Sequence, residues 1–251
     1  MRCIKLVHFV VHSFKDYVKE MFDGFYPPSS IHLDLSKVPL NAQFNECSIV
    51  DSDIWKYLSR HHYDIDENGE ILHDYDCSPL YVALGQYRRI LDFKEEDLDD
   101  KTALVDIEPQ PLPLWQIWHV YHCAQFFSDF MSILDIYDRQ LRLEFGNWLA
   151  DNEAAKSYCG RNLFCVPKDS FVEWALFMKT MQSLMHPLVE KMKAGKYVLD
   201  GKSIMDNRYH KRTPGFMCER LTAFWLAKKS GLKLKSVPVQ QVAMDSPYQR
   251  T

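Results

Sequence analysis

The sequence predicts an α/β fold in which helices flank a mixed sheet. Short apolar segments at 4–11, 80–86 and 103–107 end at turn-forming or charged residues, which is typical of buried strands. Longer segments such as 171–192 have the spacing of amphipathic helices. Strands and helices alternate along the chain, which favours one sheet covered by helices. The irregular order in the second half indicates that the sheet is mixed.

The expected elements run along the whole chain. We expect strands at 4–11, 31–35, 80–86, 103–107, 162–166 and 234–239, and helices at 15–22, 53–60, 115–130, 133–149, 171–192 and 216–229. The polar stretch 61–76, with its Asn68-Gly69 turn, predicts a surface loop, and 201–215 predicts a second polar loop. Pro187 is expected to kink or end the helix that contains it.

Composition narrows the classes of function. With 251 residues, of which 47% are hydrophobic, the chain can bury a sizeable core. A formal net charge of -4 provides no basic field, so no nucleic-acid partner is expected. Seven cysteines without a Cys-x-x-Cys pair indicate buried thiols in a reducing compartment. No apolar run reaches the roughly 18–20 residues of a membrane span, and Lys5 and His8 interrupt the run at 4–11, so we expect a cytoplasmic protein without a signal peptide.

The strand predicted at 80–86 is followed directly by Tyr87, Arg88 and Arg89. In open α/β sheets, ligands bind beyond the carboxyl ends of the strands. Two guanidinium groups at such an end indicate a site for a phosphate or diphosphate, whose oxygens they bind in a bidentate manner. The alternative is a solvated strand end paired with nearby carboxylates, at Asp92, Glu95 or Glu96.

Four segments together resemble a family of small bacterial glycosyltransferases, long catalogued as a domain of unknown function, from capsule and lipopolysaccharide gene clusters. Residues 81–90, Tyr-Val-Ala-Leu-Gly-Gln-Tyr-Arg-Arg-Ile, are similar to a family strand that ends in His-Tyr-Arg-Arg-Tyr. Residues 160–174 resemble its Asn-Met-Phe-Ile-Met-Lys-Lys segment and following helix. Residues 216–225, with 233–239, resemble its Gly-Phe-Leu-Ser-Glu-Arg-Leu signature and closing strand, and 115–127 its His-containing helix. The first 75 residues diverge, and Gln86 stands where the family has His.

The resemblance implies a GT-A-like fold, a nucleotide-sugar donor and transfer to a growing surface glycan. It implies that Arg88 and Arg89 stabilise the leaving diphosphate and that Glu219 is the catalytic base. Residues expected to bind the donor are His12, Tyr87, His119, His122, Asn162 and Arg220.

Each of these residues also has a structural interpretation. Glu219 in a first helical turn is favoured by the helix dipole, or pairs with Arg220. Asn162 suits a turn. His119 and His122, spaced i, i+3, are expected to share one helix face in the core or at the surface; no third zinc ligand accompanies them.

A divalent cation, Mn²⁺ or Mg²⁺, is left open by the pair Asp51 and Asp53, which has the Asp-x-Asp spacing of many metal-dependent transferases. The same carboxylates suit the cap of the helix expected at 53–60. The pattern recurs at 64–66 and 74–76, so it is weakly specific.

The prediction is therefore one glycosyltransferase domain over 1–251, with a nucleotide-binding half at 1–107, a donor-sugar and acceptor half at 108–240, and a tail at 241–251. We expect a hexosyltransferase whose donor is a nucleotide sugar, with a UDP-hexose as the first candidate. Its acceptor would be a saccharide or lipid-linked saccharide in capsule, lipopolysaccharide or exopolysaccharide synthesis. The basic segment 208–212 would close over the diphosphate or contact anionic lipid at the inner face of the membrane. The alternative is a non-catalytic protein of the same fold that binds a glycan or a partner.

Overall fold

A computed structural model of the chain describes residues 6–12, 30–34, 44, 47, 49–50, 62–65, 71–75, 80–86, 89–207 and 209–241. Within these residues one sheet dominates, in the order β11 (Lys233–Ser236), β7 (Thr102–Val105), β8 (Phe164–Pro167), β5 (Tyr81–Gln86), β1 (Leu6–His12), β2 (Ser30–Asp34). Two further strands, β6 (Arg89–Leu91) and β12 (Val239–Gln241), pair with each other, and β6 joins the end of β5. The expected mixed α/β architecture is confirmed.

One strand makes the sheet mixed. β8 runs antiparallel to both of its neighbours, β5 and β7, whereas β1 pairs in parallel with β2 and β5, and β11 pairs in parallel with β7. The carboxyl ends of β1, β2, β5, β7 and β11 therefore share one edge of the sheet with the amino end of β8. Strands from both the first and the second half of the chain meet at that edge.

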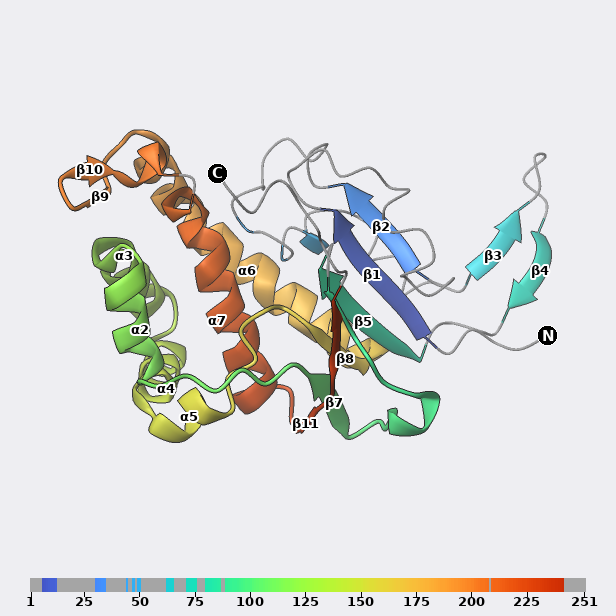
Figure 1. Cartoon of the computed structure of the whole chain (residues 1–251). Coiled ribbons are helices and arrows are strands. Elements are labelled where there is room, and N and C mark those ends of the chain that lie inside the picture. Colours follow the sequence, from blue (N-terminus) through green and yellow to red (C-terminus); the bar gives the residue numbers. More distant parts are fainter. Residues whose placement is uncertain are drawn as a thin grey trace.

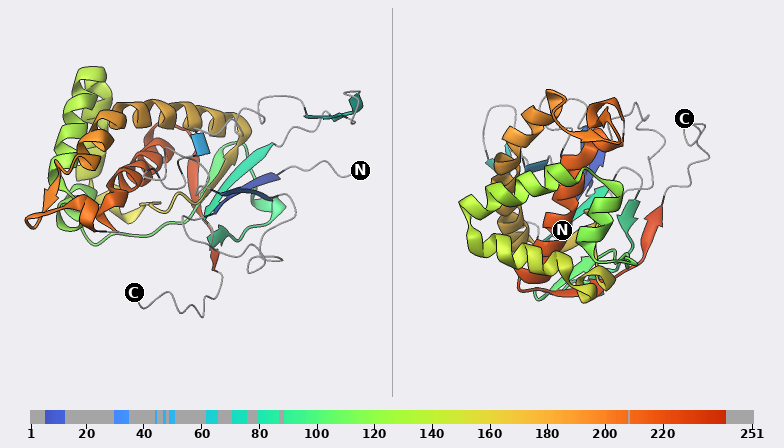
Figure 2. Two further views of the ribbon diagram at one scale, coloured as in Figure 1. Left: turned by 90° about the horizontal axis from the view of Figure 1, so that it is seen from above. Right: turned by 90° about the vertical axis from the view of Figure 1, so that its left-hand side faces the viewer.

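The helices gather on one side of the sheet, opposite the hairpin of β3 (His62–Ile65) and β4 (Ile71–Tyr75) (Figure 1). They are α2 (Leu114–Tyr121), α3 (Ala124–Tyr137), α4 (Arg139–Ala150), α5 (Asn152–Lys156), α6 (Lys168–Lys193) and α7 (Thr213–Lys228). α6 and α7 pack side by side and extend from the sheet toward α2–α4, as the left view of Figure 2 shows. A small hairpin, β9 (Val198–Leu199) with β10 (Lys202–Ser203), follows α6. None of the described helices is both long and apolar enough to span a membrane.

The core lies where α6 and α7 meet the sheet. α7 is buried almost all round over Thr213–Leu226, which is why it has no clear polar face. The Trp174 indole on α6 donates a hydrogen bond to Thr222 Oγ1 on α7 at 3.2 Å, and both residues are fully buried. Trp174 also packs edge-on against Phe164 of β8, with ring centroids 5.0 Å apart. α6 and α7 are thus held in one orientation against the sheet, at the side that carries the candidate site.

Three local expectations were wrong. The stretch 61–76 contains β3 and β4 rather than only loop; Asn68-Gly69 between two short runs is also a strong hairpin signal. Two helices were expected at 115–130 and 133–149, but the chain forms three, α2, α3 and α4. The breaks fall at His122 and Asp138, where the backbone is extended. Asp138 accepts a hydrogen bond from the Leu141 backbone N–H at 2.9 Å and so begins α4 as its cap.

Of the two outcomes expected at Pro187, a kink or an end of the helix, the end does not occur. The helix continues through Pro187 to Lys193. Leu188, Val189 and Met192 are buried in the core after the proline. Their burial, worth about 1.5–3 kcal/mol for each large apolar side chain, offsets the backbone hydrogen bond that proline removes.

Candidate functional site

Polar residues collect at the sheet edge that holds the carboxyl ends of the parallel strands. The register places His12 at the end of β1, opposite Asp34 of β2 and one position beyond the partner of Gln86 in β5. β7 leads at the same edge to Asp106 and Glu108. Ligands bind beyond this end of the strands in open α/β sheets, so this edge is the candidate site.

Arg161 connects three strands at this edge. Its guanidinium group forms ion pairs with Asp106 at 3.0 Å and with Glu108 at 2.6 Å. Its backbone carbonyl accepts a hydrogen bond from the buried Gln86 side chain at 2.5 Å. The two ion pairs of this guanidinium group thus hold the segment after β7 against the segment before β8. The Gln86 hydrogen bond links β5 to both segments. None of Arg161, Asp106 and Glu108 was predicted as a site residue, although two acidic residues directly after an expected strand are a usable signal.

Arg89 lies at the carboxyl end of β5. The antiparallel register pairs Arg89 of β6 with Gln86 of β5. Arg89 is half-buried, and its guanidinium donates a hydrogen bond to Gln86 Oε1 at 3.4 Å. The predicted neighbours Tyr87 and Arg88 lie outside the described residues, as do Asp51 and Asp53; of His12, only its place in β1 is described.

Asn162 is fully buried just before β8, which starts two residues later than expected. Its backbone φ is 53°, a left-handed conformation that Asn adopts more readily than most residues. Gly160 precedes it under the ring of Tyr158: a Cβ on Gly160 would lie 2.0 Å from Tyr158 Cε1. Only glycine therefore lets the chain pass beneath this ring and present Arg161 and Asn162 at the sheet edge.

α7 brings Glu219 and Arg220 to the same region. Glu219 is half-buried. Burial raises the pKa of the fully buried Tyr158; the charge of Arg220 opposes this, and the charges of Glu219 and Glu108 add to it. Tyr158 is therefore within electrostatic range of both α7 and the acidic segment after β7, and it joins the two parts of the site. The Glu108 backbone N–H also donates to the Tyr158 carbonyl at 2.8 Å.

Arg220 is a buried cation. It is only 4% exposed, donates from one terminal nitrogen to the Phe216 carbonyl at 2.9 Å, and lies 4.8 Å from the centre of the Trp118 ring. Its buried Nε has no hydrogen-bond partner within the described part of the chain. A buried guanidinium with an unused donor is costly unless another group accepts the hydrogen bond.

His122 lies beside Arg220 in an aromatic stack. Its ring is 4.4 Å from that of Phe216 and 5.7 Å from that of Tyr209, nearly parallel to the latter. Burial, and then the charges of Arg220 and His210, lower the pKa of His122 to about 3, so the ring is neutral at physiological pH. Among the described residues, nothing bonds its buried Nδ1.

His119 does not share the position of His122. It is exposed on α2, with Nδ1 2.8 Å from the Trp115 carbonyl oxygen. The expectation of a common face was wrong because α2 ends at Tyr121 and His122 is extended, with φ −134°. The structure brings His122, and not His119, to Arg220.

The segment before α7 places further imidazole and guanidinium groups near Arg220 and His122. Tyr209 and the 3-10 helix His210–Arg212 face the aromatic stack: the Arg212 guanidinium lies 5.3 Å from the centre of the Phe216 ring. His210 Nδ1 is buried without a hydrogen-bond partner in the described residues. The buried nitrogen atoms of His122, His210 and Arg220 form a basic cluster (defined by these three residues) at the start of α7.

No group of three His, Cys, Asp or Glu residues suited to a metal ion occurs within the residues that the structure describes. The described part of the candidate site comprises the Arg161 ion pairs, Asn162, Glu219 and the basic cluster.

Comparisons with known proteins bear on the fold. No protein-family model matches the sequence, and no curated protein matches it. The fold is similar to that of WbbM, a bifunctional glycosyltransferase solved in its apo form, with a TM-score of 0.62 and 13% sequence identity. The match covers 95% of this chain and 45% of that one, so the chain spans less than half the length of the solved protein. The chain has a glycosyltransferase-like fold.

Proposed function

We propose that this chain is a glycosyltransferase of the GT-A type, which moves a hexose from a nucleotide donor, first of all a UDP-hexose, to a saccharide acceptor. The observation that carries the proposal is the position of the half-buried Glu219, in a glycosyltransferase-like fold, beside a buried cation, Arg220. The donor diphosphate would lie at the sheet edge between Arg89 and the basic cluster, and His12 and Tyr87 would contact the nucleotide.

The leaving diphosphate needs compensating charge. Arg220 supplies a buried positive charge and an Nε–H that no described residue accepts, and Arg89 supplies a second guanidinium from β6. Because His122 is neutral, we assign it a hydrogen bond to the donor rather than a charge. Preorganised donors in a partly dry site stabilise developing negative charge without having to reorganise. Arg88 would add to this charge.

Transfer also needs a base if the reaction inverts the anomeric centre. Glu219 would take the proton from the acceptor hydroxyl as its oxygen bonds to the anomeric carbon. The bond from that carbon to the diphosphate oxygen breaks, and the nucleoside diphosphate leaves with the electron pair. Asn162 would hold a hydroxyl of the donor sugar. Burial raises the pKa of Tyr158 and of Tyr209, so these phenols stay protonated and serve as hydrogen-bond donors, not as bases.

The biological setting stays part of the proposal. Capsule, lipopolysaccharide or exopolysaccharide synthesis follows from the sequence resemblance. A lipid-linked acceptor would lie at the membrane surface, where Lys211 and Arg212, with Arg208 of the same segment, provide positive charge for anionic headgroups.

The test is release of nucleoside diphosphate from a panel of UDP-, GDP- and dTDP-hexoses, with and without Mn²⁺ or EDTA. We expect Glu219→Gln to lower turnover by about 100-fold or more, the usual contribution of a general base, while the melting temperature changes little. Glu173→Gln, at an exposed position of α6, is the matched control. Equal turnover of Glu219→Gln and the control would remove Glu219 as the base, and restoration by Mn²⁺ after EDTA would direct attention to Asp51 and Asp53.

A further inference from the structure

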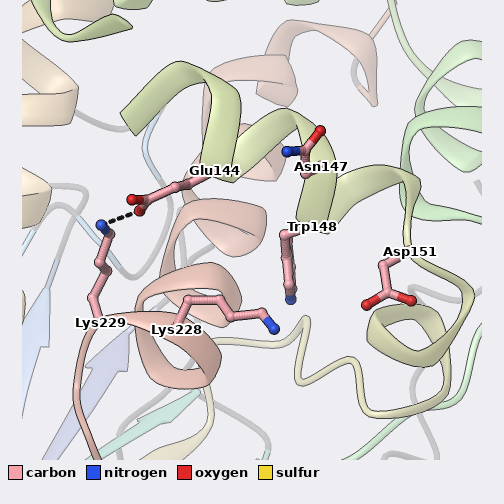
Figure 3. Close-up of a pocket in the computed structure, with 6 residues that line it drawn as sticks. All are labelled: Glu144, Asn147, Trp148, Asp151, Lys228 and Lys229. Carbon is pink, nitrogen blue, oxygen red and sulfur yellow. Dashed lines mark hydrogen bonds and ion pairs between the residues drawn. The ribbon is translucent and has the colours of Figure 1, made fainter. Parts of the chain in front are cut away.

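A hollow lies between α4 and the end of α7, apart from the candidate site. It has a volume of about 450 Å³, within the range of roughly 300–1,000 Å³ that small-molecule pockets occupy. Figure 3 shows the residues that line it: Glu144, Asn147, Trp148, Asp151, Lys228 and Lys229.

The floor of the hollow is an indole edge. Trp148 is 4% exposed and is fixed by Phe145, whose ring is nearly parallel at 6.2 Å, and by Phe224, which it meets edge-on at 5.7 Å. In the described part of the chain the Trp148 Nε1–H makes no hydrogen bond, although the indole is rigidly held. In the view of Figure 3, the Lys228 ammonium extends toward this nitrogen. An indole combines an apolar ring with one N–H donor, so this edge can contact both the C–H groups and a hydroxyl oxygen of a ligand.

The rim offers both donors and acceptors. Glu144 is engaged, since it forms an ion pair with Lys229 and accepts a hydrogen bond from Gln140 at 3.0 Å. Asn147 and Lys228 are exposed, and neither is hydrogen-bonded through its side chain to another described residue. Asp151 uses one oxygen to cap α5, accepting from the Glu153 N–H at 2.9 Å. An amide, an ammonium and a carboxylate oxygen therefore remain for a ligand.

We propose that this hollow is a saccharide-binding site. Its two carboxylates and two ammonium groups cancel in charge, which disfavours a strongly anionic ligand such as a nucleotide. Its polar lining disfavours a lipid chain. A neutral, hydroxyl-rich ligand matches the mixed donors and acceptors around a rigid aromatic edge, and a saccharide is such a ligand.

The site is distinct from the candidate catalytic site. Lys228 follows Glu219 by nine residues on α7, which is about 14 Å along the helix axis and on the opposite helix face. If the chain is the proposed glycosyltransferase, the saccharide would be a remote part of an acceptor or product glycan; this identification rests on the proposed function. The ability of the hollow to bind a saccharide does not depend on it.

The test is binding of neutral oligosaccharides to the full chain without nucleotide, measured by saturation-transfer NMR and tryptophan fluorescence. The oligosaccharides are maltotetraose, chitotetraose and a β-galactotetraose. We expect the double variant Asn147→Ala/Lys228→Ala to weaken binding by about ten-fold, because two hydrogen bonds are lost. Trp148→Phe keeps the aromatic packing, removes the N–H, and should also weaken binding. Lys179→Ala, at an exposed position of α6, should bind as the unchanged chain does.

The outcomes separate this proposal from the proposed function. Failure of all three oligosaccharides to bind the unchanged chain would overturn the saccharide site, as would equal binding by the double variant. A thermal shift with nucleotide sugars, measured on the same variants, should be unaffected. Saccharide binding that depends on Asn147 and Lys228 without any nucleotide effect would support the hollow and count against the transferase proposal.

Discussion

The side-chain amide of Gln86 donates a 2.5 Å hydrogen bond to the backbone carbonyl of Arg161, seventy-five residues later in the chain. This contact joins the end of β5 to the loop before β8, and both residues lie at the edge where we place the donor. The loop that carries Asn162 is therefore positioned by a residue that the sequence resemblance marked only as a departure.

Replacing Gln86 by Ala should destabilise the protein. The Arg161 carbonyl would lose its partner at a partly buried position, which costs about 1 kcal/mol or more. Urea unfolding measures the change. Gln140→Ala, which removes an exposed hydrogen bond to Glu144, should stay within about 0.5 kcal/mol of the unchanged chain. Equal effects of the two substitutions would show that Gln86 does not hold the loop.

Gly160→Ala tests the close approach of Tyr158. The added methyl group would lie 2.0 Å from a buried ring, so the ring or the loop must move, at a cost of about 1–3 kcal/mol. In the double variant Gly160→Ala/Tyr158→Ala the clash is absent, and the two losses of stability should therefore not add. Strict additivity in thermal unfolding would contradict this packing.

Arg161→Lys keeps the charge and removes the fork. A single ammonium cannot reach both Asp106 and Glu108 in the planar, bidentate manner of the guanidinium group. We expect a loss of about 1 kcal/mol, modest because the pairs are partly exposed to solvent, and a larger relative loss of donor binding. Calorimetric titration with the donor, compared with Lys156→Arg at an exposed pair, checks this. Unchanged donor affinity would place the fork outside the site.

His122 predicts a specific pH dependence. Its folded-state pKa, about 3, lies below its unfolded value of about 6.5, so the unfolded chain binds the extra proton between these values. Folding stability is therefore unaffected by this group above pH 6.5 and falls as the pH drops below it. From pH 7 to pH 5 the loss from this group should be about 2 kcal/mol. His122→Phe should remove that part of the loss in urea unfolding, whereas His119→Phe, at an exposed position, should not. The same pH slope in both variants would show that His122 titrates normally.

The sheet was predictable because its strands carry local signals. Short β-prone runs at 80–86 and 103–107 became β5 and β7, and the apolar start of the chain became β1. The helix ends were less predictable: periodicity continues through His122 and Asp138, although the backbone is extended at both. At Pro187 the core packing of the following turn, which local sequence does not encode, outweighs the proline.

The site was only partly predictable. Asn162, Glu219, Arg220 and Arg89 stood out from the resemblance, and the structure places them around one sheet edge and the first half of α7. Arg161 with its two carboxylates was missed because Asp106 and Arg161 are fifty-five residues apart, and only the antiparallel pairing of β7 with β8 brings them together. Tyr87, Arg88, Asp51 and Asp53 stay predictions.

The most direct test of the account is a thermal-shift measurement of the full chain with nucleoside diphosphates and nucleotide sugars, each in EDTA and in Mn²⁺. We predict that UDP and a UDP-hexose, at about 100-fold excess over their dissociation constants and in EDTA, stabilise the native state by about 2.7 kcal/mol, or roughly 5–10 °C. Arg220→Met should lose most of that shift. No shift with any nucleotide, with or without Mn²⁺, would contradict the glycosyltransferase proposal and favour a glycan- or partner-binding protein.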